Sequence, residues 1–506
     1  MTGKTLLRKA VPFCLFLLAG GMLAWLTRYE LTVDFVQYHY YNGFAFWNDR
    51  LGADVAPAAI PTFYNPLLDA VMYKMHALPQ GMYYFIQGLW FGALMYVAFK
   101  IAALFFDLTT TAGKVFAAIA VAVCATGSAT WFQMGTATHE IELAVLELTA
   151  FYLLLRDKKR FFAAGLLLGL AAGFKLTASI YCVSTGLTLI LFWKKLDKPL
   201  KNISLFALGG LAGFLIVDAF WMVKLWNLYG NPFFPFWNGI FKSPYFPEYN
   251  YVDDLHLYGK TVGDRVFAPF LMAFQYLFST YQLTIDPRFA VAVIAGIAAL
   301  IVCRKRVNSR VLFAGVYALV GFVVWEAVSF NARFLIPVEI VVGVLMPYAA
   351  FCLWKAYPEL NAETAAFYGV GTVVLYGFLG AAAFGDGWGF ANQINFFTQK
   401  FDLDENAVIL IAEKSPLFAA TRLAEQNPSV KLVQKLNGFD ERKDWRMTDY
   451  GAMKAAADKT VENAPAVYTV FVQTHLAAHL IALNNKNCQI LPLKDTYAST
   501  LLCKER

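Results

Sequence analysis

Long apolar runs separated by short polar connections recur from the N-terminus to about residue 385. Each run approaches the roughly 20 residues that an α-helix needs to cross a bilayer. The pattern predicts an α-helical polytopic membrane protein with about 11 transmembrane helices. The predicted spans are 10–27, 81–106, 114–132, 142–155, 161–174, 177–193, 203–222, 289–303, 311–329, 335–354 and 364–384. A further apolar stretch, 267–278, is interpreted as interfacial or re-entrant.

Basic residues are concentrated in the short connections, and they predict the orientation of the chain. Clusters of Lys and Arg near residues 4–9, 156–160, 194–201 and 304–310 all fall on one side of the predicted membrane. Because basic loops face the cytoplasm, the N-terminus is expected there, and an odd number of spans places the C-terminus outside. We therefore expect a multi-pass protein of the plasma (inner) membrane, with an uncleaved first helix rather than a signal peptide.

The composition supports this class of protein. The chain is 59% hydrophobic and 15% charged, whereas soluble domains contain roughly 25% charged residues. The formal charge of +7 lies mainly in the loop clusters. It therefore indicates orientation in a membrane and membrane lipids as neighbours, and no nucleic-acid partner is predicted.

After about residue 385 the composition becomes that of a small α/β domain, with strand-like runs at 407–413, 466–473 and 488–493. We therefore predict a multispanning transmembrane domain at 1–385 and an extracytoplasmic (periplasmic) α/β domain at 386–506. Cys488 and Cys503 lie in the second domain without metal-type spacing. A disulfide between them is expected if that domain is outside the cytoplasm.

The first outward loop is long, aromatic and acidic. Asp34 follows the first span within VDFVQYHYYNGFAF, close to the expected membrane surface. A carboxylate at that height is a candidate general base, and a solvated loop aspartate or a helix cap is the alternative. Asp54 and Asp69 share the loop and are possible accessory residues, although PTFYNPLLD is more typical of a turn back to the membrane.

His139 and Glu140 lie at the outer end of the fourth predicted span. Ionisable groups that enter a span are costly and tend to face a polar cavity. Glu140 is therefore a candidate second carboxylate, alone or sharing a divalent cation such as Mg²⁺ or Mn²⁺ with Asp34, and His139 is a possible accessory residue. An interfacial, charged helix end is the alternative, and the presence of a metal stays open.

Lys175 follows a small-residue helix face formed by Gly165, Gly169 and Gly173, which recur every four residues and permit close packing. The chain must turn near Lys175 on the outer side, so its ammonium is a candidate partner for a lipid phosphate. Snorkelling of the side chain to the interface is the alternative.

Two arginines on outward loops are further phosphate-binding candidates, since guanidinium groups suit bidentate recognition of phosphate. Arg333 lies among apolar residues in SFNARFLIP, and Arg288 lies in DPRFA. Pairing with Asp286 is the alternative for Arg288.

At these positions the chain resembles the GT-C glycosyltransferase superfamily. The resemblance rests on Asp34 followed by YHYYNGFAFWNDR, on GLLLGLAAGFKLTA, on YGNPFFPFWN and on ARFLIP, and it extends to about residue 385. It implies that Asp34 is the catalytic acidic residue of the first loop and that Glu140 occupies the region of a second acidic site. Many members have two adjacent acidic residues in this loop, whereas Phe35 follows Asp34 here, so metal dependence stays open.

The resemblance implies an inverting membrane glycosyltransferase that acts at the outer membrane face. The donor would be a polyprenyl-phosphate-linked sugar, and the acceptor a glycan, a lipid or a protein. Asp34 would act as base, while Lys175, Arg333 and Arg288 would bind the donor phosphate. A transporter or flippase of lipid-linked glycans is the rival hypothesis. Such proteins more often have repeated halves and polar residues at the bilayer midplane, neither of which is evident in this sequence.

The charge distribution generates a topology prediction. Cysteine-accessibility or reporter-fusion mapping in intact cells should place positions 34, 140 and 237 and the C-terminus outside. Cysteines at positions 158 and 305 should react only after permeabilisation, because basic loops remain inside. A C-terminus that is labelled only in permeabilised cells would contradict the predicted orientation.

Overall fold

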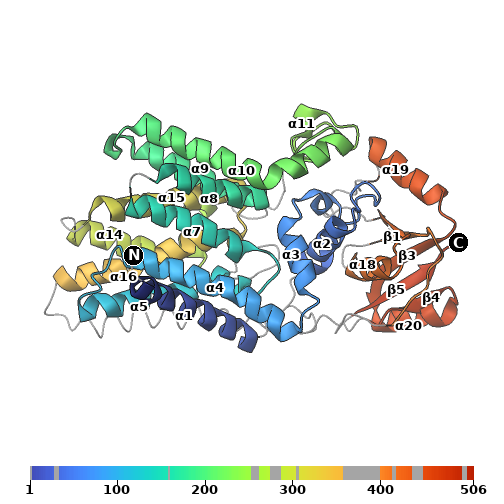
Figure 1. The fold of residues 1–506 in the computed structure, drawn as a ribbon, viewed down its shortest axis with the longest axis horizontal. Coiled ribbons are helices and arrows are strands. Elements are labelled where there is room, and N and C mark those ends of the chain that lie inside the picture. The colour runs from blue at the N-terminus through green and yellow to red at the C-terminus, as the bar shows by residue number, and fades with distance from the viewer. Residues whose placement is uncertain are drawn as a thin grey trace.

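The computed structural model describes residues 3–27, 34–157, 160–251, 261–273, 286–303, 307–356, 399–412, 417–435, 448, 450–492 and 498–506. Figure 1 shows a bundle of long helices beside a small domain built on a β-sheet, with the helices of the first loop between them. The predicted span 364–384 and residues 274–278 of the apolar stretch 267–278 lie outside the described residues, while the start of that stretch contains the short helix α13 (Ala268–Leu271).

Most of the predicted spans correspond to helices of the bundle. These helices are α1 (Gly3–Thr27), α4 (Gln80–Ala102), α5 (Thr111–Ala125), α6 (Ser128–Gln133), α7 (Glu140–Arg156), α8 (Phe161–Phe174), α9 (Ser179–Leu191), α10 (Pro199–Tyr229), α14 (Arg288–Val302), α15 (Ser309–Val328) and α16 (Ile336–Ala356). Within the described part of the chain, five helical segments are long and apolar enough to cross a membrane, and further apolar helices are shorter. The chain is a polytopic, mainly helical membrane protein, as predicted.

Most helices begin or end a few residues from their predicted bounds, and two segments differ more strongly. The stretch predicted as the span 114–132 forms α5 and the separate short helix α6, because carboxylate oxygens of Glu339 accept hydrogen bonds from the Ala129 and Thr130 N–H groups and cap the start of α6. Helix α10 has 31 residues and is therefore about 46 Å long, which exceeds a hydrocarbon core of about 30 Å. Its C-terminal end leads towards the short helix α11 (Asn238–Phe241) (Figure 1).

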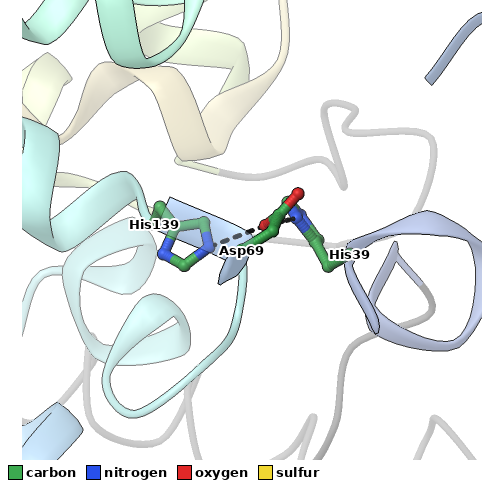
Figure 2. Close-up of side chains that lie close together, drawn as sticks. All are labelled: His39, Asp69 and His139. Carbon is green, nitrogen blue, oxygen red and sulfur yellow. Dashed lines mark hydrogen bonds and ion pairs between the residues drawn. The ribbon is translucent and has the colours of Figure 1, made fainter. Parts of the chain in front are cut away.

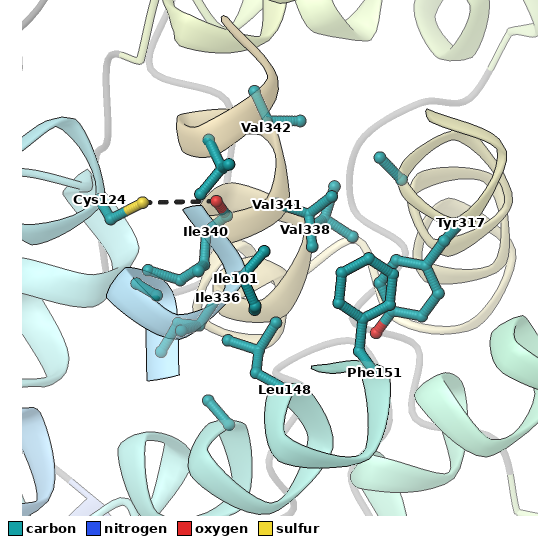
Figure 3. Close-up of a cluster of buried hydrophobic side chains, with 14 of the residues drawn as sticks. Ile101, Cys124, Leu148, Phe151, Tyr317, Ile336, Val338, Ile340, Val341 and Val342 are labelled. Atoms are coloured by element: carbon teal, nitrogen blue, oxygen red, sulfur yellow. Dashed lines mark hydrogen bonds between the residues drawn. The ribbon is translucent and has the colours of Figure 1, made fainter. Parts of the chain in front are cut away.

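Helix α16 lies at the centre of the bundle. In the segment 332–356 that contains it, 83% of the apolar window is buried, against 17% in α1, which is peripheral. Figure 3 shows its aliphatic side chains packed between α5, α7 and α15. The Phe151 and Tyr317 rings are tilted by 37° with their centroids 4.4 Å apart, and the Cys124 thiol donates a hydrogen bond to the Ile340 carbonyl. Apolar packing, rather than buried polar contacts, dominates this part of the molecule.

Helices α8 and α10 pack closely through glycines. A Cβ atom at Gly169 would lie 2.0 Å from the Gly210 carbonyl oxygen, a separation that no side chain tolerates. The small-residue face predicted from Gly165, Gly169 and Gly173 is therefore confirmed as a contact between helices. This packing fixes the end of α8, where Lys175 is the C-cap residue.

The C-terminal part is an α/β domain with the strand order β2-β1-β3-β5-β4, in which β1 pairs in parallel with β2 and β3, and β5 pairs antiparallel with β3 and β4. Its elements are β1 (Val408–Ile411), α18 (Leu417–Gln426), β2 (Lys431–Gln434), α19 (Gly451–Glu462), β3 (Val467–Thr474), α20 (His475–Asn484), β4 (Cys488–Ile490) and β5 (Ala498–Lys504). Cys488 and Cys503 are register partners across β4 and β5, and a disulfide joins them.

The first loop contains the π-helix η1 (Phe35–His39), α2 (Tyr40–Trp47), the 3₁₀-helix η2 (Ile60–Phe63) and α3 (Leu67–Met75). One edge of this loop joins the C-terminal sheet. Val55 of the loop forms a parallel bridge with Val433 of the strand β2. The Val55 N–H donates to the Leu432 carbonyl at 2.9 Å, and the Gln434 N–H donates to the Val55 carbonyl at 3.0 Å. The loop is thereby bonded directly to the C-terminal domain.

The glycine contact generates a stability prediction. Gly169→Val should lower the unfolding temperature of the purified protein in detergent, because the methyl groups must separate α8 from α10, at a cost of about 1–3 kcal/mol or more. Gly315→Val is the matched control, since a Cβ at Gly315 in α15 meets no atom within 4 Å. Equal unfolding temperatures for the two variants would contradict the close packing of α8 and α10.

Candidate active site

Asp34 is the N-cap residue of η1. The Tyr40 N–H donates to the Phe35 carbonyl, which is the i→i+5 pattern of a π-helix. This wide winding brings Asp34 and His39, five residues apart, to one side of the segment. Single π-helical turns are frequent at functional sites.

Four charged side chains meet at this point, and we name Asp34, Arg333, Glu140 and Lys175 the charge cluster. Arg333 Nη1 donates a hydrogen bond to Asp34 Oδ2, and Arg333 Nε lies 3.8 Å from Glu140 Oε1. Lys175 Nζ lies 2.5 Å from the same Glu140 oxygen and donates to the Thr138 carbonyl at 3.0 Å. The charges alternate in sign along the cluster, so each carboxylate is neutralised by a neighbouring cation.

The two cations lie near the same aromatic ring. The Arg333 guanidinium carbon lies 5.2 Å and Lys175 Nζ lies 5.6 Å from the ring centroid of Phe334. Arg333 Nε is buried and donates no hydrogen bond to any described residue. Since a buried donor without a partner costs free energy, this N–H group is available to an anionic ligand.

The charge cluster keeps Asp34 ionised. Burial alone would raise the pKa of this carboxyl, but the nearby charges of Arg333, His39 and Lys175 together hold the pKa below its ordinary value. Asp34 is therefore a weak base for as long as Arg333 is bound to it.

A second cluster lies beside the first. Asp69 Oδ1, from α3, is 2.6 Å from His39 Nδ1 and 3.0 Å from His139 Nε2 (Figure 2). Burial opposes the charge on His139, yet hydrogen bonds with Asp69 and Glu142 raise its pKa to about 9. Burial likewise opposes ionisation of Asp69, but the two histidines lower its pKa to about 2. His39 has a lowered pKa, chiefly because it is buried.

Two of the predicted site residues lie in other environments. Asp54 accepts hydrogen bonds from Arg50 and from the Leu432 N–H group, at 2.8 Å for the latter, so it holds the first loop against the C-terminal domain. Arg288 is 1% exposed and is bound by Asp286 and Glu339, as in the alternative considered for it. Its guanidinium is held by protein carboxylates, which leaves Arg333 and Lys175 as the cations that lie together.

The charge cluster is a poor site for the shared divalent cation considered above. Arg333 and Lys175 already occupy the positions beside Asp34 and Glu140 at ion-pair distances. A metal ion there would meet two positive charges as well as the two carboxylates. We therefore derive no chemistry from a metal between Asp34 and Glu140.

Sequence reasoning did not single out His39 or Phe334. His39 is visible in the sequence as the fifth residue after Asp34, but a regular α-helix would bring the fourth residue to the same side instead. Phe334 follows Arg333 directly, and nothing in the sequence distinguishes it from the other aromatic residues near helix ends. Both positions depend on local winding and tertiary contact.

Comparison of the sequence with protein-family profiles and with curated proteins gives no match. Comparison of the structure with solved structures gives matches over nearly the whole chain. The structure of ArnT from Cupriavidus metallidurans in the apo state matches 98% of this chain and 98% of its own, with a TM-score of 0.59 and 13% identity. The structure of the same enzyme bound to undecaprenyl phosphate matches 97% of each chain, with a TM-score of 0.54 and 13% identity.

These matches include both the helical bundle and the C-terminal sheet, because they extend over 97% or more of both chains. At 13% identity the likeness concerns the arrangement of the backbone. The chain therefore has the GT-C fold that its sequence motifs predicted.

Proposed function

We propose that this protein is an integral-membrane glycosyltransferase that transfers a sugar from a polyprenyl-phosphate donor to a glycan, lipid or protein acceptor at the outer membrane face. The observation that carries the proposal is the charge cluster, in which a buried carboxylate of the first loop lies beside two cations. The GT-C fold and the undecaprenyl phosphate bound by ArnT support the choice of donor.

Lys175 and Arg333 are the proposed ligands of the donor phosphate. Their side chains are 15% and 16% exposed, so they are reachable from outside although mostly buried. A compact ammonium and a planar guanidinium provide several N–H donors, including the unpartnered Arg333 Nε, for phosphate oxygens. Glu140 would hold both cations in place while the site is empty.

In the proposed reaction the acceptor hydroxyl oxygen attacks the anomeric carbon of the donor sugar. A new bond forms from that carbon to the acceptor oxygen, and the bond from the same carbon to the phosphate oxygen breaks. The lipid phosphate leaves with the bonding electron pair, and Asp34 takes the hydroxyl proton. Lys175 and Arg333 stabilise the charge that develops on the departing phosphate. A single displacement of this kind inverts the anomeric configuration.

Donor binding would also activate the base. Arg333 is bound to Asp34 and lowers the pKa of that carboxyl. A phosphate that draws the guanidinium hydrogen bonds to itself removes part of this effect, so the pKa of Asp34 rises towards its ordinary value. The carboxylate then becomes a better proton acceptor when a donor is in place, which disfavours proton transfer in the empty site.

The proposal is tested by incubating the purified protein with a panel of polyprenyl-phosphate sugars and measuring release of the lipid phosphate. With an active donor, Asp34→Asn should reduce turnover about 10²–10⁴-fold, because an amide retains the shape of the side chain but cannot accept the proton. Asp49→Asn is the matched control in the same loop, since the Asp49 side chain is 86% exposed and pairs only with Lys224 among the described residues.

Turnover by Asp34→Asn at the wild-type rate would exclude Asp34 as the base. The proposed function itself would be contradicted if the folded protein bound none of the donors and released lipid phosphate from none of them.

A second prediction concerns Lys175. Lys175→Ala should weaken donor binding about tenfold or more, because a charge-assisted hydrogen bond contributes roughly 1.5–3 kcal/mol. Lys175→Arg should lose less, since it keeps the charge but alters the geometry. Donor affinity is measured by titrating each variant with a non-transferable donor analogue and following tryptophan fluorescence.

Removal of Lys175 also takes away one ion-pair partner of Glu140. A change in donor affinity in the single variant could therefore have two causes. The double variant Lys175→Ala/Glu140→Gln removes both charges and separates loss of the phosphate ligand from exposure of an unpaired carboxylate. Lys224→Ala is the control for a lysine outside the cluster. Unchanged donor affinity in Lys175→Ala and in the double variant would contradict the phosphate-binding role.

A further inference from the structure

The second cluster has the composition of a metal site. His39 comes from the end of η1, Asp69 from α3, and His139 from the N-cap position of α7. Each of the three side chains offers one ligand atom, and these atoms all lie within 4.8 Å of one another. The three residues are 4%, 4% and 5% exposed. Three potential ligands from separate segments therefore converge at a buried point (Figure 2).

Hydrogen bonding does not satisfy this cluster. His39 Nδ1 is bound to Asp69, while His39 Nε2 is buried and has no hydrogen-bond partner in the described part of the chain. In the neutral ring this nitrogen is an acceptor without a donor, and in the charged ring it is a donor without an acceptor. Either state leaves Nε2 unsatisfied within the described part of the chain. A ligand bound at Nδ1 in place of the proton shared with Asp69 would fix Nε2 as the protonated, donating nitrogen of the ring.

The geometry suits a small divalent cation. Zinc bound tetrahedrally at about 2.0–2.1 Å separates its ligand atoms by about 3.3 Å. The observed separations from Asp69 Oδ1 are 2.6 Å to His39 Nδ1 and 3.0 Å to His139 Nε2, so these two pairs need to move apart by less than one ångström. All three ligand atoms lie within 4.8 Å of one another, so the two imidazole nitrogens need to approach each other by at most about 1.5 Å. The three ligand atoms can thus surround an ion without rearrangement of the backbone.

The surroundings of His139 support the same interpretation. Its second ring nitrogen, Nδ1, lies 3.4 Å from Glu142 Oε1. Histidines that bind metals usually donate their other N–H group to a carboxylate or a carbonyl, which fixes the tautomer and the ring orientation. Glu142, three residues further along α7, occupies that position and adds a negative charge near the site.

We propose that His39, Asp69 and His139 bind one divalent transition-metal ion of the zinc class. Two imidazoles and one carboxylate favour zinc over magnesium, which prefers oxygen ligands in an octahedral arrangement. The ion replaces the protons that the two rings share with Asp69, and its fourth position remains for water or another ligand. It is separate from the charge cluster, whose carboxylates are bound to Arg333 and Lys175.

Such an ion joins three segments that carry the candidate active site. His39 is five residues from Asp34, and His139 precedes Glu140 directly. The bound metal therefore fixes η1 against the start of α7 and sets the distance between the two carboxylates. The inference concerns metal binding, so it does not depend on the identity of the transferred sugar or on transferase activity.

The test uses the full-length protein purified in detergent through a tag without histidines, because a polyhistidine tag would itself bind metal. The protein is stripped with a chelator, reloaded with zinc, freed of excess metal and measured by inductively coupled plasma mass spectrometry. About one zinc per chain is expected. Loading the wild-type protein with Co²⁺ instead of zinc should give the strong visible absorption bands of a four-coordinate site. This measurement tests the site without any substitution that could disturb the fold.

The double variant His39→Gln/His139→Gln should lose both the retained zinc and the cobalt spectrum. His76→Gln is the matched control, since His76 is a half-buried histidine of the same loop that stacks on Tyr83 at 4.3 Å and is outside the cluster. Glu142→Gln should keep the site but weaken zinc binding about 10–100-fold, as expected of a residue that orients a ligand.

The proposal is overturned if folded wild-type protein retains no zinc and gives no cobalt spectrum, which would identify the cluster as a hydrogen-bonded triad alone. It is also overturned if the double variant, with its fold verified by circular dichroism, retains as much zinc as the wild type. If the wild-type protein retains zinc but releases lipid phosphate from no donor, the proposed function is contradicted and the metal site is supported.

Discussion

Charged side chains buried at the edge of a membrane must neutralise one another, and the active-site region depends on this constraint. Removing one partner of a buried ion pair typically costs about 3–5 kcal/mol, because the remaining charge is left without solvent. Asp34, Arg333, Glu140 and Lys175 satisfy the constraint as an alternating series. Since these residues come from the first loop, η6 (Ala332–Leu335), α7 and the end of α8, the series also fixes four segments relative to one another.

The first loop is held from several sides, and this explains how a long loop can carry a precise site. The Asn65 amide donates to the Gly173 carbonyl at 3.0 Å and to Asp218 at 2.8 Å, which ties the loop to the end of α8 and to the interior of α10. On its far side, Val55 pairs with Val433 of the C-terminal sheet. The loop therefore behaves as a packed layer between two larger bodies, which limits its conformational freedom and pre-organises Asp34.

Much of the fold could be predicted from the sequence because apolar length and loop charge are one-dimensional signals. The glycine spacing before Lys175 likewise predicted a close contact between helices, because residues without side chains let two backbones approach each other. The partner of each charge could not be predicted in the same way. Arg288 and Arg333 look alike on outward loops, yet one is enclosed by Asp286 and Glu339 and the other reaches Asp34. That difference depends on which helices pack together, and the role of His39 depends on π-helical winding.

The bridge between Val55 and Val433 has a mechanical consequence. The hydroxyl groups of Tyr40 and Tyr73 also donate to Glu425 of α18, at 2.8 Å and 2.7 Å, so the first loop and the C-terminal domain share a continuous bonded surface. The first loop, which includes η1, is therefore expected to move together with the C-terminal domain, because these bonds connect the two. A displacement of the C-terminal domain would therefore act on the ion pair between Asp34, at the start of η1, and Arg333, which belongs to η6.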